Sequence, residues 1–420
     1  IRDRSQAKNV RRDRMKDKIM KTVDEMKEKL IEMAKKIFEY AEIAFQEKRS
    51  SKLLADFLEE EGFEVERNVA GLETAFIAKF GSGLPVIALL AEYDALPELG
   101  HACGHNMIGV ISAGAGVALK RTGVLDKHEG TILVVGSPAE EKGAGKRILI
   151  KNGVFEDVDV AMMIHPASFT TGFDISYALK VYKVEFFGKP SHAAADPEEG
   201  INALDSMIQL FSGIGLMRQQ LPEKVRIHGI ITNGGQAPNI IPEYTSAEVI
   251  VRALEKDTLD RVTEKFRKLV EGAALMTGCR YNLEELESMN EVFVNMPLAK
   301  TLERNFEIVG EKVVERTYEQ GVGSTDMGDV TQVVPGIHAY VNITGGKYVP
   351  AHTHEFAKFA NSKEGYEAMI RAVKALAMTC YDVFTSKDLL NEIKDYFRSC
   401  LLYTSPSPRD LSTSRMPSSA

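Results

Sequence analysis

The sequence has no long apolar segment. No run of about 18 consecutive apolar residues, the length that a membrane-spanning helix needs, occurs in its 420 residues. The first twenty residues carry basic charge with no apolar segment behind it, so they do not read as a signal peptide. We therefore predict a cytoplasmic protein with no membrane partner.

Positive charge and paired cysteines are also scarce. Lysine and arginine number 52 against 60 acidic residues, which gives a formal net charge of -8. Nucleic acids are held largely by clustered basic side chains that release counterions from phosphates, so a nucleic-acid partner is not expected. The four cysteines are too widely spaced for a disulfide framework. They are Cys103, Cys279, Cys380 and Cys400.

The two ends of the sequence differ from the rest. Residues 1–14 hold six basic and two acidic side chains without a helical or strand period, and a helical pattern starts at Met15. We predict that the natural chain begins at Met15. The segments CLLYTSPSPRD and SRMPSSA within residues 400–420 read like translated sequencing adaptors, so we predict that this tail is not native. The alternative is an ordinary Ser/Pro-rich tail.

Between these ends, apolar strands alternate with helices. With 44% apolar and 27% charged residues, the chain can bury a sizeable core. The alternation predicts an α/β fold with a mostly parallel sheet. We assign residues 15–178 to the first part of this α/β domain. The expected strands cover residues 74–80, 85–91, 131–136 and 159–164, with helices at 15–61 (two), 106–120 and 146–152.

Residues 179–289 follow a different order, βαββαβ. This order is the ferredoxin-like unit, which can fold as a small domain of its own. Residues 290–399 then return to the first style, with a strand at 337–343. The sequence therefore predicts one catalytic domain, residues 15–178 and 290–399, interrupted by an inserted α+β domain.

Unusual polar residues follow the expected strands of the catalytic domain. In open α/β sheets, ligands bind beyond the carboxyl ends of the strands, and residues from distant stretches fall there. The histidines His101, His128 and His338 have no such partners, and we assign them structural roles. The residues that follow the strands are Asp94, Cys103, His105, Glu140, Glu141, His165, His352 and His354.

These residue types suit a metal centre. Thiolate, imidazole and carboxylate together are donors for zinc or, with more oxygen, manganese. Cys103, His105, Glu141, His165 and His352 are five candidate ligands, too many for one catalytic zinc and suited to two divalent ions. Of two adjacent acids, one can ligate while the other acts as general base. Asp94 would accept a proton from the far nitrogen of a ligating histidine.

Six motifs resemble one known family, the M20 metallopeptidases, and more narrowly the M20D amidohydrolases, which include aminobenzoyl-glutamate hydrolase and Xaa-Arg dipeptidase-like proteins. The resemblance covers essentially residues 15–399. The motifs are AEYDALPELGHACGHN, GSPAEEKGAGK, MMIHP, FFGKPSHAAADPEEGINALD, HGIITNGGQAPNIIP and PAHTHEF.

The resemblance implies a role for each matching residue. Cys103 would bridge two metals, and His105, Glu141, His165 and His352 would be the further ligands, although His354 stands next to the last of these and is an alternative. Glu140 would be the acid and base. The insert would be a lid and dimerisation domain of a homodimer. From it, His192 would reach the partner subunit's active site and polarise the scissile carbonyl, and Asn239 would contact substrate.

The sequence thus predicts a metal-dependent amidohydrolase or peptidase that cleaves a small N-acyl amino acid or dipeptide with a metal-activated water. One alternative is a hydrolase with Cys103 as nucleophile and His105 as its base. Two positions apart is poor geometry for that pair, and it leaves the other donors unused. A second alternative is a non-catalytic peptide-binding or partner subunit of an amidase. The acyl group and amino acid are not predicted.

Overall fold

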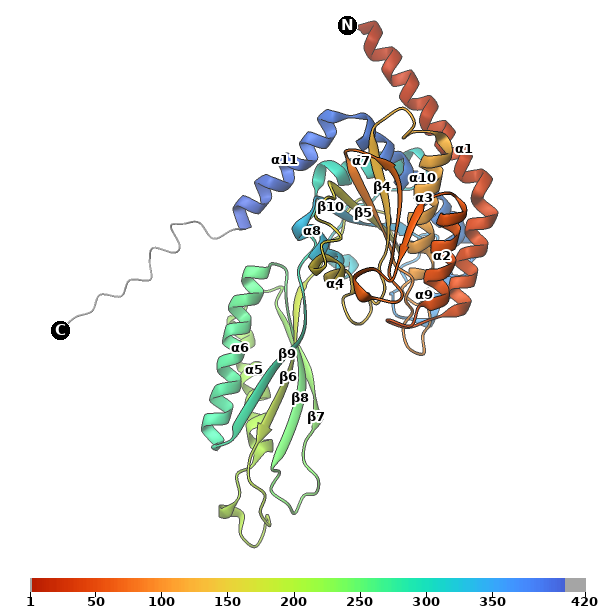
Figure 1. The fold of residues 1–420 in the computed structure, drawn as a ribbon. Helices are drawn as coiled ribbons and strands as arrows, with labels where there is room; N and C mark the ends of the chain where they lie inside the picture. Colours follow the sequence, from red (N-terminus) through yellow and green to blue (C-terminus); the bar gives the residue numbers. More distant parts are fainter. Residues whose placement is uncertain (1, 405–420) are drawn as a thin grey trace, which may run out of the picture. The chain divides into compact units, whose positions relative to one another are not determined.

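The computed structural model describes the backbone of residues 2–404 and the side chains of residues 14–400. The chain forms two compact units (Figure 1). Unit 1 comprises Ile1–Asp174, Phe293–Thr317 and Val330–Ala420, and unit 2 comprises Ile175–Val292 and Tyr318–Asp329. The insert therefore extends a few residues beyond the expected 179–289. It also includes the later segment 318–329, which the sequence pattern assigns to the catalytic domain.

Unit 1 is built on a six-stranded sheet in the order β1-β2-β4-β3-β5-β10. The pairs β4–β3, β3–β5 and β5–β10 are parallel, whereas β1 and β2 run antiparallel to their neighbours. The expected α/β fold is confirmed, with a mixed sheet whose central strands are parallel. The strands are β1 (Glu64–Arg67), β2 (Phe76–Ser82), β3 (Val86–Ala91), β4 (Gly130–Gly136), β5 (Val160–Ala167) and β10 (Gly336–Asn342).

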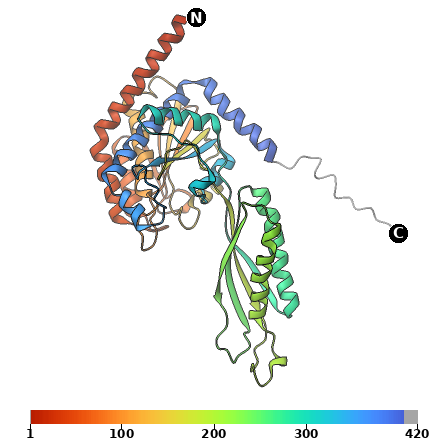
Figure 2. The ribbon, with the colours of Figure 1, turned by 180° about the vertical axis from the view of Figure 1, so that it is seen from behind.

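Helix α3 (His105–Thr122) is the central helix of unit 1. It packs against β3, β4 and β5, and α1 (Arg2–Tyr40) and α10 (Lys363–Thr385) pack against it (Figures 1 and 2). Small residues along α3 allow this close packing. The remaining helices of unit 1 are α2 (Lys48–Glu60), α4 (Gly145–Lys151), α7 (Met296–Ile308), α9 (His354–Phe359) and α11 (Lys387–Thr404), while α8 (Met327–Val333) begins in unit 2 and ends in unit 1.

Helix α1 begins earlier than expected. The apolar period predicts a helix from Met15, whereas the helix starts at Arg2. Lysine, arginine, glutamine and alanine have high helix propensity, so the backbone continues as helix where no apolar period is visible. The prediction about residues 400–420 falls largely on residues 405–420, which lie outside the described part of the chain.

Unit 2 has the predicted βαββαβ order. Its sheet is antiparallel throughout, in the order β7-β8-β6-β9, with α5 and α6 side by side against it (Figures 1 and 2). Tyr182, Val184 and Phe186 alternate along β6 and are buried beneath the two helices. The ferredoxin-like prediction is confirmed. The elements are β6 (Ala178–Phe187), α5 (Ala203–Met217), β7 (Arg226–Asn233), β8 (Tyr244–Ala253), α6 (Lys256–Thr277) and β9 (Arg280–Met289).

Among the described residues, no helix combines the length and apolarity that crossing a bilayer requires.

Candidate metal centre

The loop before α3 carries two of the predicted ligands. Cys103 and His105 flank Gly104, which has a positive φ of 82°. A side chain there would bring its Cβ within 2.8 Å of the Pro166 ring. Glycine therefore allows both the left-handed turn between the donors and the close approach of this loop to the end of β5, where His165 lies. His165 is within β5, not after it.

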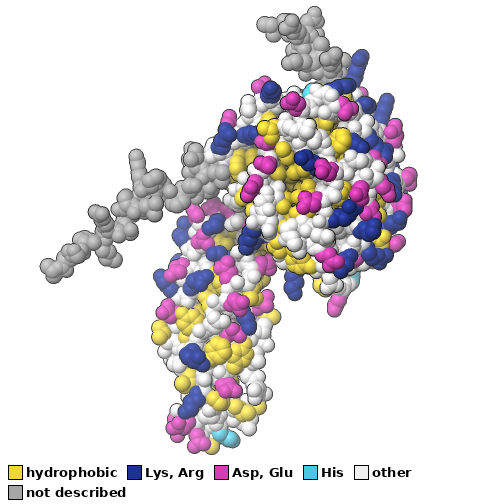
Figure 3. Space-filling view, viewed as in Figure 1, with side chains coloured by type: hydrophobic (Ala, Val, Ile, Leu, Met, Phe, Trp, Pro, Cys, Tyr) yellow, Lys and Arg dark blue, Asp and Glu magenta, His cyan; other side chains and the backbone are white. Residues whose placement is uncertain are grey.

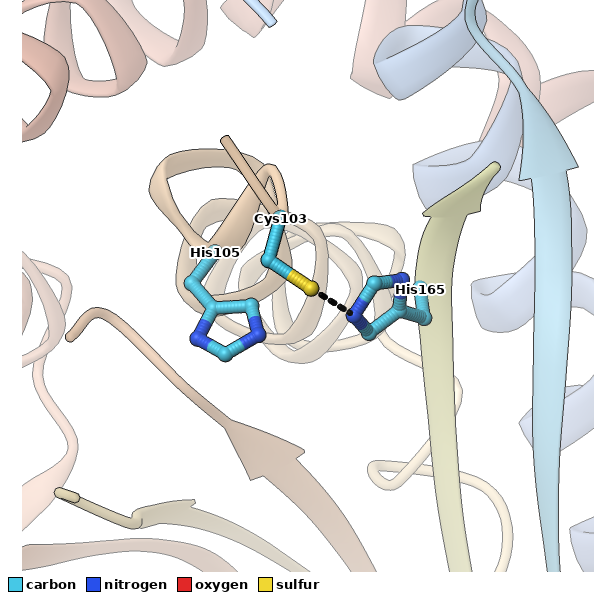
Figure 4. Close-up of side chains that lie close together, drawn as sticks. All are labelled: Cys103, His105 and His165. Carbon is cyan, nitrogen blue, oxygen red and sulfur yellow. Dashed lines mark hydrogen bonds between the residues drawn. The ribbon is translucent and has the colours of Figure 1, made fainter. Parts of the chain in front are cut away.

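Two sets of three donor atoms meet at the Cys103 sulfur. The first set is Cys103, His105 and His165, and the second is Cys103, Glu141 and His352; within each set the donor atoms lie within 4.8 Å of one another. Figure 4 shows the Cys103 sulfur directed toward His165, and the distance from Sγ to His165 Nε2 is 3.4 Å. Two donor sets that share one sulfur are the arrangement expected for two adjacent divalent ions with a bridging thiolate.

Hydrogen bonds fix the orientation of both buried imidazoles. His105 Nδ1 lies 2.9 Å from Asp94 Oδ1, and His165 Nδ1 lies 2.7 Å from the Pro166 carbonyl oxygen. Because these oxygens are acceptors, each ring donates its Nδ1 proton outward. The Nε2 lone pair of a neutral ring then faces the other donors, as a ligating histidine requires.

Buried carboxylates hold the turn after β4. The amide of Ala139 donates to Glu47 Oε1, and the amide of Glu141 donates to Asp94 Oδ2, both at 2.9 Å. Ala139 has an unusual positive φ of 61°, a conformation that needs such support. The backbone on each side of Glu140 is thus fixed. Burial raises the pKa of Glu47 to about 7, with Asp94 adding to the effect.

The centre contains buried polar atoms that make no hydrogen bond among the described residues. They include His105 Nε2 and Glu141 Oε1, which lie 3.8 Å apart. Burying polar atoms without partners is costly, and a divalent ion between them would satisfy both. The residues present therefore fit a metal.

The charges of the ligands respond to the same burial. Burial, with the Glu141 carboxylate nearby, raises the pKa of the Cys103 thiol well above its usual range. Burial also raises the pKa of Glu141. Burial lowers the pKa of His165 to about 3, which keeps that ring neutral. Burial by itself would lower the pKa of His105, but the neighbouring Asp94 and Cys103 outweigh this effect, so the pKa of His105 is raised.

His352 lies at the open side of the centre. Its Nε2 is 3.5 Å from Glu141 Oε2, and its side chain is 54% exposed. The amide of His352 donates to the Ala102 carbonyl at 2.8 Å, which ties this loop to the one that carries Cys103. His354 begins α9, is exposed, and belongs to neither donor set.

Sequence reasoning did not assign roles to two charged residues at this centre. Glu92 and Lys146 are fully buried and form an ion pair of 2.5 Å. Glu92 directly follows the apolar strand β3, a signal that could have marked it. Lys146 stands in the charged run EEKGAGKR, which gives no sign that this lysine is buried.

One histidine assigned a structural role lies beside a predicted ligand. The His338 ring is 5.5 Å from the His165 ring, and its Nδ1 is 3.3 Å from Asp174 Oδ2. His101 is different, because its Nε2 is bonded to the Ile37 carbonyl oxygen at 2.9 Å.

Unit 2 brings His192 and Asn239 together. The amide of Ala193 donates to the Asn239 carbonyl at 3.0 Å. The side chains of His192 and Asn239 are both exposed. His192 Nδ1 accepts hydrogen bonds from the amides of Ala194 and Ala195, at 3.2 and 3.1 Å. A neutral His192 ring must then carry its proton on Nε2, so the exposed end of the ring is a hydrogen-bond donor.

Comparisons with known proteins show what this chain is similar to. Residues 177–276 match the family model of the peptidase dimerisation domain. The chain is 36% identical to the Xaa-Arg dipeptidase of Mus musculus over 400 residues, covering 91% of this chain and 92% of that one. It is 29% identical over 439 residues to one subunit of the p-aminobenzoyl-glutamate hydrolase of Escherichia coli (strain K12), covering 87% and 91%.

The fold has a counterpart among solved structures. A dinuclear metal binding peptidase from the M20 family of Bacillus subtilis superimposes with a TM-score of 0.69 at 22% identity, over 86% of this chain and 99% of that one. At this identity the likeness concerns the fold.

Proposed function

This chain belongs to the M20D amidohydrolases of the M20 metallopeptidase family, which are metal-dependent hydrolases of amide bonds, and we propose that it cleaves a small N-acyl amino acid or dipeptide at two divalent ions, zinc or manganese. The ions would be held by Cys103, His105, Glu141, His165 and His352. The observation that carries the proposal is the pair of donor sets that share the Cys103 sulfur.

When bound, divalent ions lower the pKa of a water and polarise the substrate carbonyl. Glu140 is the proton carrier in our proposal. It accepts the proton of the attacking water and delivers it to the leaving amine. Its carboxylate lies within 4.8 Å of the His105 and Glu141 donor atoms, and the turn that carries it is anchored on both sides. Asp94 orients His105 and the Glu141 amide.

His192 is the oxyanion donor in this proposal. Its ring presents an Nε2 proton to solvent because Nδ1 is engaged by two backbone amides. A donor fixed in this way can stabilise the negative oxygen that forms on the attacked carbonyl. The adjoining Asn239 would bind the substrate. Both would act on the active site of a second copy of the chain.

A homodimer through unit 2 is supported by the match to the dimerisation domain and by apolar surface. Figure 3 shows apolar side chains among charged ones on unit 2. Large apolar side chains that are at least half exposed lie on α5 and α6, and contacts with another chain would remove them from water. They are Ile208, Leu216, Leu275 and Met276.

We also expect a cytoplasmic location. Among the described residues, Cys103, Cys279, Cys380 and Cys400 form no disulfide. A metal-binding thiol must stay reduced, which a reducing compartment ensures.

A cysteine nucleophile is less well supported. A reactive cysteine has a depressed pKa, whereas burial raises the pKa of Cys103. If the chain were instead a non-catalytic partner subunit of an amidase, the purified protein would bind metal but hydrolyse none of the substrates tested.

The direct test is hydrolysis of a substrate panel by the metal-loaded protein. The panel holds dipeptides, N-acetyl amino acids and aminobenzoyl-glutamate, each assayed with zinc and with manganese. Glu140→Gln should keep both ions and lose roughly 10²- to 10⁴-fold in turnover. Glu129→Gln, at an exposed glutamate of the same unit, is the matched control. Unchanged turnover of the metal-replete Glu140 variant would remove Glu140 from its role.

A further inference from the structure

Glu92 forms a completely buried ion pair beside the metal centre. Glu92 Oε1 accepts a hydrogen bond from Lys146 Nζ at 2.5 Å, and both side chains have no exposed surface. Removing two charges from water has a desolvation cost that attraction within the pair often fails to offset. The pair therefore calls for an explanation other than stability.

The second oxygen of the carboxylate faces the centre. Glu92 Oε2 is buried and makes no hydrogen bond among the described residues, and it lies 3.5 Å from His105 Nε2. That nitrogen is itself buried without a hydrogen bond, and it is the inward-facing atom because Nδ1 is bonded to Asp94. A carboxylate oxygen and a ring nitrogen, both able to bind a metal ion, thus face each other at a distance longer than an ordinary hydrogen bond.

A further carboxylate approaches the same point. Oxygens of Glu92 and Glu140 lie within 4.8 Å of each other, and Glu140 also lies within 4.8 Å of the His105 donor. Like charges so close in a buried place repel strongly, and a cation among them would reverse the sign of the interaction.

We propose that Glu92 Oε2 is an additional ligand of the ion held by His105, and that Lys146 positions the carboxylate by engaging Oε1. This inference rests on the proposed two-ion function. With Oε1 occupied by the lysine, only one oxygen is presented to the ion. The Lys146 charge also offsets part of the negative charge that Cys103, Glu141 and Glu92 bring together. An added oxygen donor shifts the preference of this position toward manganese.

The test is calorimetric titration of metal-free protein with manganese and with zinc, alongside metal analysis of the loaded samples. Glu92→Gln keeps an oxygen that can accept from Lys146 but removes the charge. It should weaken one of the two manganese-binding events at least roughly tenfold, the scale on which outer residues already act, and leave the other event unchanged. Zinc binding, which depends more on sulfur and nitrogen, should weaken less.

Two further variants separate ligation from folding. Asp382→Asn breaks another buried pair of unit 1, with Lys16 at 2.8 Å, and should lower the melting temperature without changing either metal affinity. Glu92→Gln/Lys146→Met removes both charges together, avoids an unpaired buried lysine, and should also lose the one binding event.

The outcomes distinguish this inference from the function on which it rests. If both Glu92 variants bind two ions with wild-type affinities, Glu92 is not a ligand, and the two-ion function stands. If the wild-type protein itself binds no ion, the proposed function fails and this inference fails with it.

Discussion

The two units carry their functional residues in opposite ways. In unit 1 the donors are largely buried, and hydrogen bonds that His105 and His165 donate to Asp94 and the Pro166 carbonyl fix the imidazoles. In unit 2, His192 and Asn239 are exposed, and hydrogen bonds from backbone amides of residues 193–195 hold them. A buried centre can bind ions within one chain. An exposed donor needs a second surface that removes it from water before it can act as an oxyanion hole.

The largest effect expected is the loss of the shared sulfur in unit 1. Cys103→Ala removes the atom common to both donor sets, so both ions and turnover should be lost, the latter on the order of 10⁴-fold, as when one member of an interdependent catalytic set is removed. Metal analysis and the hydrolysis assay measure this. Cys380→Ala, at a buried cysteine of α10, should keep two ions. Retention of both ions by the Cys103 variant would break the shared-donor account.

Unit 2 should affect turnover without affecting the ions. His192→Ala should keep both metals and lose roughly 10²- to 10³-fold in turnover, the usual effect of removing one oxyanion donor. Co-expression with Glu140→Gln sharpens the comparison. Random pairing gives half mixed dimers, each with one complete site, so activity should return to about a quarter of the wild-type value. No recovery would show that His192 acts within its own chain.

The same substitution should have different effects on stability in the two units. Asp174 in unit 1 pairs with Arg316 at 2.9 Å, and both side chains are nearly fully buried. Asp174→Asn should therefore lower the free energy of unfolding by about 3–5 kcal/mol. Asp260 in unit 2 pairs with Lys256 at 2.7 Å, and the Asp260 side chain is 41% exposed. Asp260→Asn should therefore change the free energy of unfolding by only about 0–1 kcal/mol. Denaturant titration of both variants tests the contrast.

The Asp174 contribution should also depend on pH. Burial acts to raise its pKa, but hydrogen bonding to His338 and the charge of Arg316 lower it below the ordinary value. A carboxylate with a lowered folded-state pKa stabilises fully above its unfolded pKa of about 3.9. Its contribution should disappear as the pH falls through the lower folded value. An Asp174→Asn deficit that stays constant down to about pH 2 would contradict this.

The smallest effect expected is proton release when metal binds. The pKa of the Cys103 thiol is raised by burial, so it carries a proton at neutral pH in the metal-free protein and must lose it to become a ligand. Calorimetry in buffers of different ionisation enthalpy should show at least about one proton released per chain. Binding should weaken as the pH falls. Binding heats independent of the buffer would argue against thiolate ligation.

The candidate donors could be predicted where the topology is simple. Cys103 and Glu141 stand in the loops that follow β3 and β4, and His165 stands near the end of β5; the apolar runs of these strands are clear in the sequence, and parallel strands bring such ends together. The four-residue strand β1 was not predicted because its sequence, EVER, is mostly charged and exposed. It pairs with β2 by backbone hydrogen bonds, which leave no apolar pattern.

Other parts of the centre depend on tertiary packing that no local pattern records. Glu47 stands in the polar run QEKRSS and becomes an anchor of the Ala139 amide only after α2 packs onto unit 1. Lys146 is buried beside Glu92, its partner in an ion pair, which stands 54 residues earlier. Such roles follow from contacts between distant segments, which spacing along the chain does not reveal.

Anomalous scattering from crystals of the manganese- or zinc-loaded protein tests the central claim most directly. We expect two peaks about 3.5–4 Å apart, one near Cys103, His105 and His165 and the other near Cys103, Glu141 and His352. The absence of peaks at these residues, or an ion bound only elsewhere, would contradict it.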